Sequence, residues 1–346
     1  MLRSLAVQEL LSLGLSQFFI GQLTDYENEI DRLGRVVSIT KGQVTIDTGS
    51  SIRGAKPDQE AVVGDFCLFS EHGTDEVKID RILERKSLLK RHSHSKEKAQ
   101  NICSNVDYIF LVSSMNSEFK LNRVERYLIA IRESGAEPVI ILTKKDLCED
   151  PDKFISELKE LGGDLPVLMM NALQRDGIDQ MQPYLGAGNT VALVGSSGVG
   201  KTTLINALKN GGEDGDTQGI SFGDRGRHTT TSRELLKLES GALIIDTPGM
   251  REFAPVINES IAEVFDDIEN LAGQCRYRDC SHTSEPGCQV LKAVSEGHVS
   301  QRRFDNYHKL MRHQQRLENP QFREDERKYW KQITKEYRRM KKDGDK

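Results

Sequence analysis

One segment carries the clearest chemistry in the chain: Gly195-Ser196-Ser197-Gly198-Val199-Gly200-Lys201-Thr202 matches the pattern G-x-x-x-x-G-K-[ST] completely. Glycines at these positions let backbone N–H groups curve around a phosphate, and the helix that follows adds a favourable field at its N-terminus. In this pattern Lys201 bridges the β- and γ-phosphates, and the hydroxyl of Thr202 binds Mg²⁺. The segment, with Thr203 directly after it, predicts a site for a nucleoside triphosphate but not which base it holds.

A second polar turn, Asp246-Thr247-Pro248-Gly249, follows the apolar residues 243–245. An Asp at this point can hold Mg²⁺ through water, and the backbone N–H of Gly249 can meet the γ-phosphate. Between the two segments lies the polar stretch 226–231, where a switch loop would supply a hydroxyl to the metal. Spacing does not decide among its three threonines, and Thr230 is our first choice. The predicted Mg²⁺ ligands are therefore Thr202, Thr230 and Asp246.

The base is indicated by Thr143-Lys144-Lys145-Asp146, which ends the apolar run 138–142. A carboxylate there accepts hydrogen bonds from N1–H and N2–H₂ of guanine, and adenine does not present this edge. The stem of Lys144 would lie along the plane of the base. After the next predicted strand, Asn171 and Ala172 follow, and the backbone N–H of Ala172 would meet guanine O6. These residues predict a guanine nucleotide.

The order of the motifs is unusual, because the base-reading segment precedes the phosphate loop in this chain. In an ordinary GTPase it follows. The other GTPase elements, the switch stretch 226–231 and the turn 246–249, follow the phosphate loop as a permutation requires. The sequence therefore predicts a circularly permuted GTPase domain.

The residue that orients the water for hydrolysis differs from the one that many GTPases have. Met250 stands where many GTPases have a Gln that orients the attacking water, and Met cannot do this. His228, in the predicted switch loop, is the substitute that we predict, because a neutral imidazole can hold and polarise a water. The alternative is a loop histidine that contacts a phosphate or RNA. Without an in-line Gln, slow intrinsic hydrolysis that needs a partner is expected.

A metal site is indicated near the C-terminus by the spacing Cys275-x₄-Cys280-x-His282-x₅-Cys288. Three thiolates and one imidazole complete a tetrahedral shell, which is typical of structural Zn²⁺. Free thiols are the alternative, because the spacing is not the commonest one. Arg276 and Arg278, between the ligands, would form a small basic face. The other three cysteines are scattered, so no structural disulfide is expected.

The elements that must position these residues fall into two patterns. Four short β-rich pieces separated by turns predict a small barrel, either an oligonucleotide-binding (OB) barrel or an SH3-like one; they are residues 35–39, 43–46, 66–69 and 77–79. From residue 105 apolar runs alternate with amphipathic helices, which predicts a parallel sheet covered on both faces with its sites at the carboxyl ends of the strands. The predicted strands are 106–112, 138–142, 166–170, 191–194 and 243–245, and the predicted helices are 121–133, 154–161 and 201–208.

Charge is segregated along the chain although its formal net charge is only −5. Residues 84–98 hold six Lys or Arg against two Glu, and residues 311–346 hold twelve against seven acidic residues. Residues 259–269 are acidic with no basic residue. Each run is either a solvated face or a surface for a polyanion. Residues 301–317 predict a helix with a core-facing side, and the segment from Arg323 onward is either a solvated helix or an arm that orders on RNA.

Composition describes a soluble globular chain of two or three domains, with 346 residues, 37% hydrophobic and 29% charged. The apolar stretch 5–15 is interrupted by Gln8 and Glu9, and no cleavage site of small residues follows it. A cytoplasmic protein without a membrane segment is therefore expected.

The permuted motif order, residues 226–231, the segment from Asp246 to Glu252 and the cluster from Cys275 to Cys288 together resemble the ribosome small-subunit-dependent GTPase A family (RsgA, also called YjeQ). The resemblance extends from about Arg35 to His308. GTPases often have Ser where this chain has Asn171, and more commonly Asn where it has Thr143. Both positions keep a hydrogen-bonding side chain, so the departures bear on base affinity rather than base identity.

The resemblance implies an α/β fold: a permuted P-loop GTPase domain, an N-terminal OB-like β-barrel and a C-terminal zinc-binding helical domain. The expected division is an extension at 1–34, the barrel at 35–95, the GTPase domain at 96–258 and the zinc domain with a basic tail at 259–346. It implies a monomeric GTPase that binds the 30S ribosomal subunit and its 16S rRNA late in maturation, hydrolyses GTP to GDP, and carries one structural Zn²⁺ with Mg²⁺ at the nucleotide. The alternative is an RNA-binding scaffold protein that uses guanine nucleotide only as a structural ligand.

Overall fold

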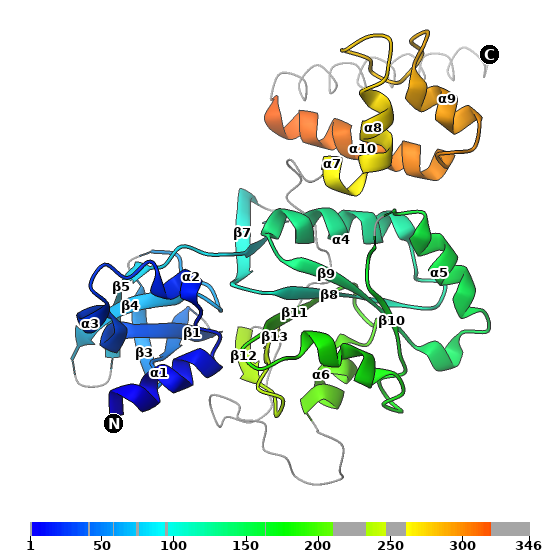
Figure 1. The fold of residues 1–346 in the computed structure, drawn as a ribbon. Helices are drawn as coiled ribbons and strands as arrows, with labels where there is room; N and C mark the ends of the chain where they lie inside the picture. The colour runs from blue at the N-terminus through cyan, green and yellow to red at the C-terminus, as the bar shows by residue number, and fades with distance from the viewer. Residues whose placement is uncertain are drawn as a thin grey trace, which may run out of the picture. The chain divides into compact units, whose positions relative to one another are not determined.

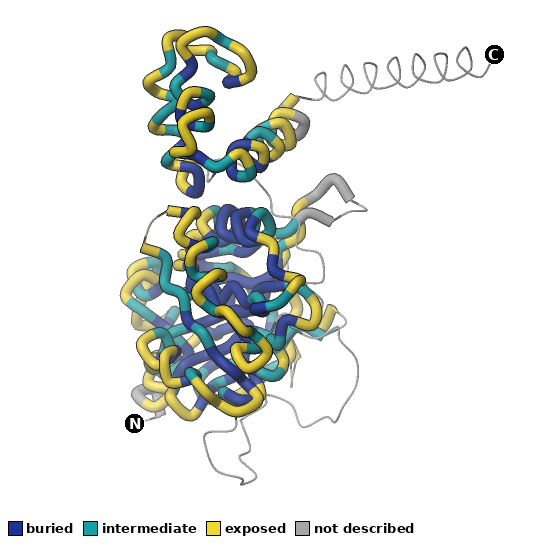
Figure 2. The backbone as a smooth tube through the Cα atoms, turned by 90° about the vertical axis from the view of Figure 1, so that its right-hand side faces the viewer, coloured by how far each residue is buried: buried dark blue, intermediate teal, exposed yellow. Residues whose placement is uncertain are grey.

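The computed structural model describes residues 2–40, 42–57, 59–73, 76–93, 96–162, 164–209, 233–246 and 261–319. They belong to two compact units, Met1–Val256 and Ile257–Lys346, and each is described by itself (Figure 1). Buried residues of the first unit concentrate in its central strands (Figure 2). Among the described helices, none combines the length and the apolar composition that a membrane crossing requires.

The first unit begins with short helices that pack beside a barrel. They are α1 (Leu2–Ser12), α2 (Gln17–Ile20), α3 (Tyr26–Glu29) and η1 (Ile30–Arg32). Leu10, Leu13 and Phe19 are buried, and the ring of Phe19 lies 4.4 Å from that of Phe66 in the barrel. The apolar N-terminal stretch is therefore part of the core of this unit.

The barrel has five strands, β1 (Leu33–Thr40), β2 (Gln43–Asp47), β3 (Ile52–Pro57), β4 (Phe66–His72) and β5 (Glu76–Ile82). They pair in the order β1-β2-β3-β5-β4, and β4 pairs again with β1. β3 and β5 are parallel, which a chain of simple hairpins cannot produce. This order is that of an OB barrel, so the SH3-like alternative is wrong. Four of the strands confirm the sequence prediction.

β3 is the barrel strand that the sequence did not predict. Its residues carry Gly54 in the middle and Pro57 at the end, and only Ala55 is buried. Glycine and proline are depleted in strands, and a single inward side chain gives no alternation to recognise. Pairing with β2 and β5 holds this strand in place.

The α/β part of the unit has the sheet order β10-β9-β8-β11-β13-β12. Its strands are β8 (Tyr108–Ser114), β9 (Glu137–Thr143), β10 (Val167–Met169), β11 (Thr190–Val194), β12 (Arg233–Lys237) and β13 (Leu243–Asp246). All pairs are parallel except that of β12 with β13. Helix α4 (Leu121–Ser134) lies on one face and α6 (Lys201–Lys209) on the other, with α5 (Pro151–Lys159) and η3 (Ile178–Tyr184) completing the unit (Figure 1). The predicted strands and helices of this region are confirmed within a few residues.

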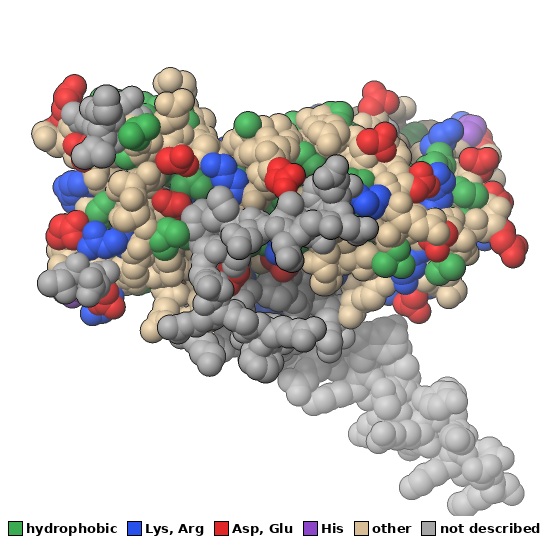
Figure 3. Space-filling model, turned by 90° about the horizontal axis from the view of Figure 1, so that it is seen from below, with side chains coloured by type: hydrophobic (Ala, Val, Ile, Leu, Met, Phe, Trp, Pro, Cys, Tyr) green, Lys and Arg blue, Asp and Glu red, His purple; other side chains and the backbone are tan. Residues whose placement is uncertain are grey.

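A hairpin of β6 (Leu88–Ser93) and β7 (Lys96–Ser104) leads from the barrel into this sheet and carries much of the basic run. Part of that charge is neutralised in the fold, because Arg85 pairs with Asp65 at 2.7 Å and Lys86 pairs with Asp107. Figure 3 shows one face on which the acidic and basic side chains of the described residues are interspersed. The basic run is therefore less charged in the fold than in the sequence.

One buried cation links the barrel to the α/β part. Arg35, on β1, is 1% exposed and donates hydrogen bonds to the carbonyls of Gly64 and Asn105, each at 3.2 Å, and to that of Leu13. It also lies 3.0 Å from the hydroxyl of Thr190, at the start of β11. Burial lowers its pKa to about 10, an effect opposed by Asp107 and Asp65. In addition, β1 pairs with β12, so the barrel and the α/β sheet are continuous.

The second unit is helical, with α7 (Ile261–Val264), α8 (Asp266–Ala272), α9 (Gln289–Ser295) and α10 (Gln301–Glu318). On α10, Phe304, Tyr307 and Leu310 are buried, as predicted for a core-facing side. Arg303 is 2% exposed and pairs with Asp267 at 2.6 Å. One carboxylate of the acidic run, Asp267, is thus paired within the fold.

Candidate nucleotide site and cysteine cluster

The phosphate loop joins a fully buried strand to a helix. All five residues of β11 are buried, and α6 begins at Lys201. Gly195 has φ +147°, and a Cβ there would lie 2.2 Å from the carbonyl oxygen of Val112. Only glycine fits this position, because the loop passes directly over the end of β8. Ser197, Gly198 and Thr202 are exposed, so the loop presents backbone and hydroxyl groups to solvent.

Two charged groups of the predicted site are partly desolvated. Lys201 Nζ donates to the carbonyls of Gly195 and Ser196 at 2.7 and 2.6 Å, and burial lowers its pKa against the opposing effect of Asp246. Burial raises the pKa of Asp246, at the end of β13, against the effects of Lys209 and Lys201. An anionic phosphate beside the lysine and a cation beside the carboxylate would relieve both penalties.

The base-reading segment contacts the phosphate loop directly. Thr143, at the end of β9, places its hydroxyl 2.6 Å from the carbonyl oxygen of Val199 and 3.2 Å from that of Ser113. Lys144 follows in the left-handed conformation with φ +61°, and Lys145 pairs with Asp176 at 3.0 Å. Asp146 lies in the short helix η2 (Lys145–Leu147) and is exposed.

The second predicted base contact follows β10, which is the parallel neighbour of β9. Asn171 is 3% exposed, and its side-chain oxygen accepts from the backbone N–H groups of Leu173 and Gln174 at 3.1 and 3.3 Å. Within the described parts of the chain, its Nδ2 is buried without a hydrogen-bond partner. Ala172 is 9% exposed. Both loops therefore lie at the carboxyl edge of the sheet.

Several predicted residues cannot be located in this site. His228, Thr230, Gly249 and Met250 lie outside the described residues. The hydrolytic and switch assignments therefore rest on sequence.

The sequence did not indicate a basic helix face behind the phosphate loop. Arg123, on α4, donates from Nη1 to the hydroxyl of Ser196 at 2.9 Å. Burial lowers the pKa of the adjacent Arg126, and the charge of Arg123 lowers it further. Arg123 and Ser196 are far apart in the chain and share no motif, so no local pattern could have predicted the contact.

The four predicted metal ligands converge in the second unit. The ligand atoms of Cys275, Cys280, His282 and Cys288 all lie within 4.8 Å of one another. The sulfurs of Cys275 and Cys288 are 3.8 Å apart, and each lies 3.6 or 3.4 Å from Nδ1 of His282. A tetrahedral ion with Zn–S of about 2.3 Å and Zn–N of about 2.0 Å spaces its ligands by about 3.8 Å between sulfurs and about 3.5 Å between sulfur and nitrogen. The residues present therefore fit a closed tetrahedral metal site.

Local hydrogen bonds hold the loop that carries these ligands. Glu285 accepts from the hydroxyl of Ser281 and from the backbone N–H groups of Ser281, Thr283 and Ser284, the latter at 2.8 to 3.0 Å. The hydroxyl of Ser281 contributes most, followed by backbone N–H groups of the same loop, to a pKa of Glu285 well below the usual range. The backbone N–H groups of Gln289 and Leu291 each lie 3.4 Å from a ligand sulfur. N–H donors of this kind stabilise thiolate ligands.

Comparison with known proteins matches residues 82–255 to the family described as RsgA GTPase. "Small ribosomal subunit biogenesis GTPase RsgA 2" of Vibrio vulnificus is 42% identical over 97% of this chain and 96% of its own length. The protein of the same name from Vibrio parahaemolyticus is 41% identical over 88% of this chain and 86% of its own. Among solved structures, YjeQ from Thermotoga maritima aligns with a TM-score of 0.60 and 27% identity, over 82% of this chain and 98% of that one.

The strand order, the base-reading loop that precedes the phosphate loop, and these matches agree with one another. The fold is that of a circularly permuted GTPase with an N-terminal β-barrel and a C-terminal helical unit that carries a Cys/His cluster. The chain belongs to the RsgA GTPase family.

Proposed function

We propose that this chain binds the 30S ribosomal subunit, hydrolyses GTP to GDP and phosphate when that particle stimulates it, and acts late in small-subunit maturation. The relatives' names link them to small ribosomal subunit biogenesis. The observation that carries the proposal is the hydrogen bond of Thr143 to Val199, at 2.6 Å, which joins the base-reading loop to the phosphate loop. A single nucleotide can then contact both loops.

Each residue of the proposed site has a role. Asp146 accepts from guanine N1–H and N2–H₂, and Lys144 lies along the base. In the segment that begins at Asn171, the backbone N–H of Ala172 donates to guanine O6. The backbone of residues 195–200 surrounds the β-phosphate, and Lys201 neutralises the β- and γ-phosphates. Thr202, Asp246 and, from the switch segment, Thr230 would hold Mg²⁺, which when bound neutralises charge on the phosphate oxygens. Thr203 lies in the first turn of α6, directly after the phosphate loop. The backbone N–H of Gly249 contacts the γ-phosphate.

For the hydrolytic step we propose that His228 orients the attacking water, since Met250 cannot. For the cysteine cluster we propose one structural Zn²⁺ held by Cys275, Cys280, His282 and Cys288, because three sulfurs and one nitrogen favour zinc in a closed site. Its role would be to fix the loop between α8 and α9 rather than to take part in hydrolysis.

We also propose that this chain contacts 16S rRNA, is a monomer and is located in the cytoplasm. Its proposed division is an extension at 1–34, the barrel at 35–95, the GTPase domain at 96–258 and the zinc domain at 259–346. The rival function, an RNA-binding scaffold that holds guanine nucleotide structurally, is favoured only by Met250.

The test is GTP hydrolysis with and without purified 30S subunits, at low and moderate salt, for the unmodified protein and His228→Ala. We expect stimulation by 30S that His228→Ala abolishes while GTP still binds. Stimulation that survives in His228→Ala would reject the histidine alone. If 30S stimulates hydrolysis at neither the low nor the moderate salt concentration, the particle-activated GTPase is rejected and the scaffold function is left.

A further inference from the structure

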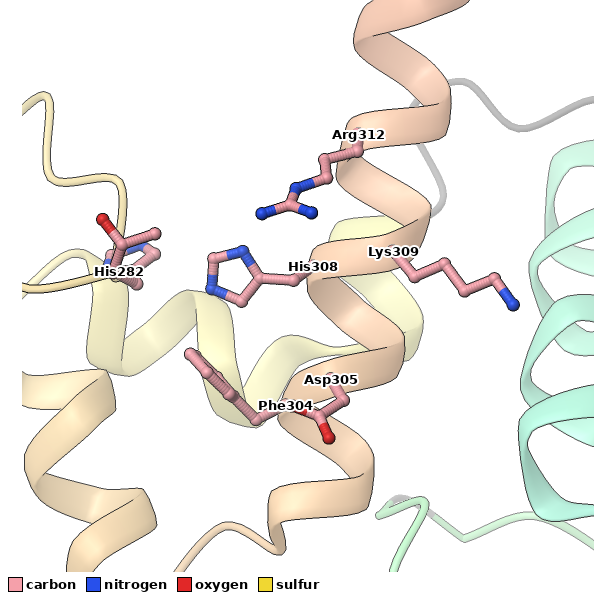
Figure 4. A pocket seen from close by; sticks show the side chains of 7 residues that line it. His282, Phe304, Asp305, His308, Lys309 and Arg312 are labelled. Carbon is pink, nitrogen blue, oxygen red and sulfur yellow. The ribbon is translucent and has the colours of Figure 1, made fainter. Parts of the chain in front are cut away.

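A pocket of the second unit and the start of α4 in the first unit both carry cations that the sites above do not use. The pocket has a volume of about 510 Å³ and lies beside α10 (Figure 4). Its cations are dispersed, because Lys309 and Arg312 point in different directions, and Asp305 also lines it. On α4, by contrast, a guanidinium contacts the phosphate loop itself. The charge on α4 therefore lies where a nucleotide would be bound.

Arg123 holds the second residue of the phosphate loop from outside the loop. Its Nη1 donates to the hydroxyl of Ser196 at 2.9 Å. Tyr127, which is buried one turn further along α4, makes a side-chain hydrogen bond with the same serine. The carbonyl of Ser196 in turn accepts from the ammonium of Lys201 at 2.6 Å. Arg123 is thus joined through one residue to the lysine that is proposed to neutralise the phosphates.

Arg126 adds a second guanidinium to the same face of α4, because residues three apart are neighbours on a helix. Burial lowers the pKa of Arg126, and the charge of Arg123 lowers it further, against the smaller opposing effects of Tyr127 and Glu125. No carboxylate of the described residues forms an ion pair with either arginine. Two like charges that are close together and partly removed from water favour the approach of an anion.

The anion that would meet this charge is the phosphate chain of the nucleotide. GTP carries more negative charge than GDP, so a guanidinium beside the phosphate loop lowers the free energy of the GTP-bound state more. Salt screens this attraction only in part, since the Debye length is about 10 Å at 0.1 M. We propose that Arg123, held against Ser196, raises the affinity of this site for GTP relative to GDP, with Arg126 as a weaker second cation. The inference rests on the nucleotide site of the proposed function.

The test measures the affinities of the full-length protein for a non-hydrolysable GTP analogue and for GDP, by competition with a fluorescent GDP analogue in the presence of Mg²⁺. Arg123→Gln removes the charge and keeps a donor for Ser196, so the GTP analogue should lose about threefold to tenfold more affinity than GDP. Arg123→Lys keeps the charge and should retain most of the preference. Ser196→Ala keeps both guanidinium groups, so any loss should be equal for the two nucleotides. Arg132→Gln removes an equal charge from the exposed far end of α4 and is the matched control.

Equal losses for the two nucleotides in Arg123→Gln would overturn the proposal, because a role in holding the loop alone acts on both. So would the same unequal loss in Arg132→Gln, or a loss in Arg123→Lys as large as in Arg123→Gln. An unequal loss confined to Arg123→Gln would support it.

The measurement needs no ribosomal particle, which separates this inference from the proposed function. If 30S does not stimulate hydrolysis while Arg123→Gln shows the expected unequal loss, only the particle-activated hydrolysis fails. If 30S stimulates hydrolysis while Arg123→Gln affects the two nucleotides equally, only the role of Arg123 fails. If neither nucleotide binds the unmodified protein, both fail.

Discussion

At the scale of residues, Thr143 explains how this chain departs from the commoner Asn without losing the link between its two nucleotide loops. Its hydroxyl reaches the carbonyl of Val199, in the phosphate loop, at 2.6 Å. Thr143 is buried, so neither this hydroxyl nor the carbonyl can turn to water instead. The sequence identified the segment as base-reading, but it could not indicate that its first residue also braces the phosphate loop.

Thr143→Val removes this hydroxyl at nearly constant volume. The carbonyl of Val199 then lacks its partner, which costs about 1–3 kcal/mol, so GDP affinity should fall about fivefold to a hundredfold. Titration with a fluorescent GDP analogue measures the change. Thr143→Ser keeps the hydroxyl and serves as the control. Unchanged affinity in Thr143→Val would mean that this hydrogen bond does not support nucleotide binding.

Asp146→Asn tests the assignment of the base. Replacing the carboxylate removes an acceptor for guanine N1–H and N2–H₂, so GTP affinity should fall on the order of a hundredfold. The new amide can donate to O2 of xanthine, so XTP should bind better than GTP. Competition binding with both nucleotides gives the ratio, with Asp152→Asn, an exposed change on α5, as control. A variant that still prefers GTP would assign the base contact to another residue.

At the scale of elements, the sequence predicted the strands and helices whose apolar pattern is strong, and the structure confirms them. β9, β11 and α10 are examples, because buried parallel strands read as continuous apolar runs and α10 repeats at helical spacing. β12 was not predicted. It has only two buried residues, and pairing with β13 and β1 defines it. Tertiary pairing of this kind leaves no local signal in the sequence.

The loop between α8 and α9 is the element whose structure should depend most on metal. Mass spectrometry after alkylation at mildly alkaline pH tests this. With zinc bound, Cys148 should react, while Cys275, Cys280 and Cys288 should react only after chelation. Burial raises the pKa of Cys67 above its ordinary value and that of Cys103 to about 12, so these two thiols should stay protonated and unreactive until the protein unfolds. Equal reactivity of the three cluster cysteines with and without chelator would contradict a bound metal.

At the scale of the whole molecule, the barrel and the GTPase sheet are held together by β1. Its pairing with β12 and the hydrogen bonds of Arg35 join segments that the sequence assigned to separate domains. The sequence could predict a barrel and a sheet from their periodicities. It could not predict their junction, because an arginine in a β-rich segment is more often exposed than buried.

Arg35→Met should therefore destabilise this unit strongly. The substitution removes the donor to the buried carbonyls of Leu13 and Asn105, whereas Asp65 and Asp107 keep their pairs with Arg85 and Lys86. Leaving a buried acceptor unpaired typically costs about 1–3 kcal/mol, and here two acceptors are affected. Urea denaturation followed by circular dichroism measures the loss. Arg53→Gln breaks a surface pair with Glu71 on the same barrel and should cost at most about 1 kcal/mol. Equal effects of the two substitutions would show that the buried position of Arg35 carries no special weight.

At the same scale, we propose that guanine nucleotide controls the affinity of this chain for the small ribosomal subunit, with the GTP-bound form binding more tightly. The most direct measurement is its affinity for purified 30S subunits in the presence of a non-hydrolysable GTP analogue and of GDP, at one salt concentration. We expect binding at least about tenfold tighter with the analogue, a difference of about 1.4 kcal/mol, and no such difference in Lys201→Ala. Equal affinity with both nucleotides would contradict it and would make guanine nucleotide a structural ligand.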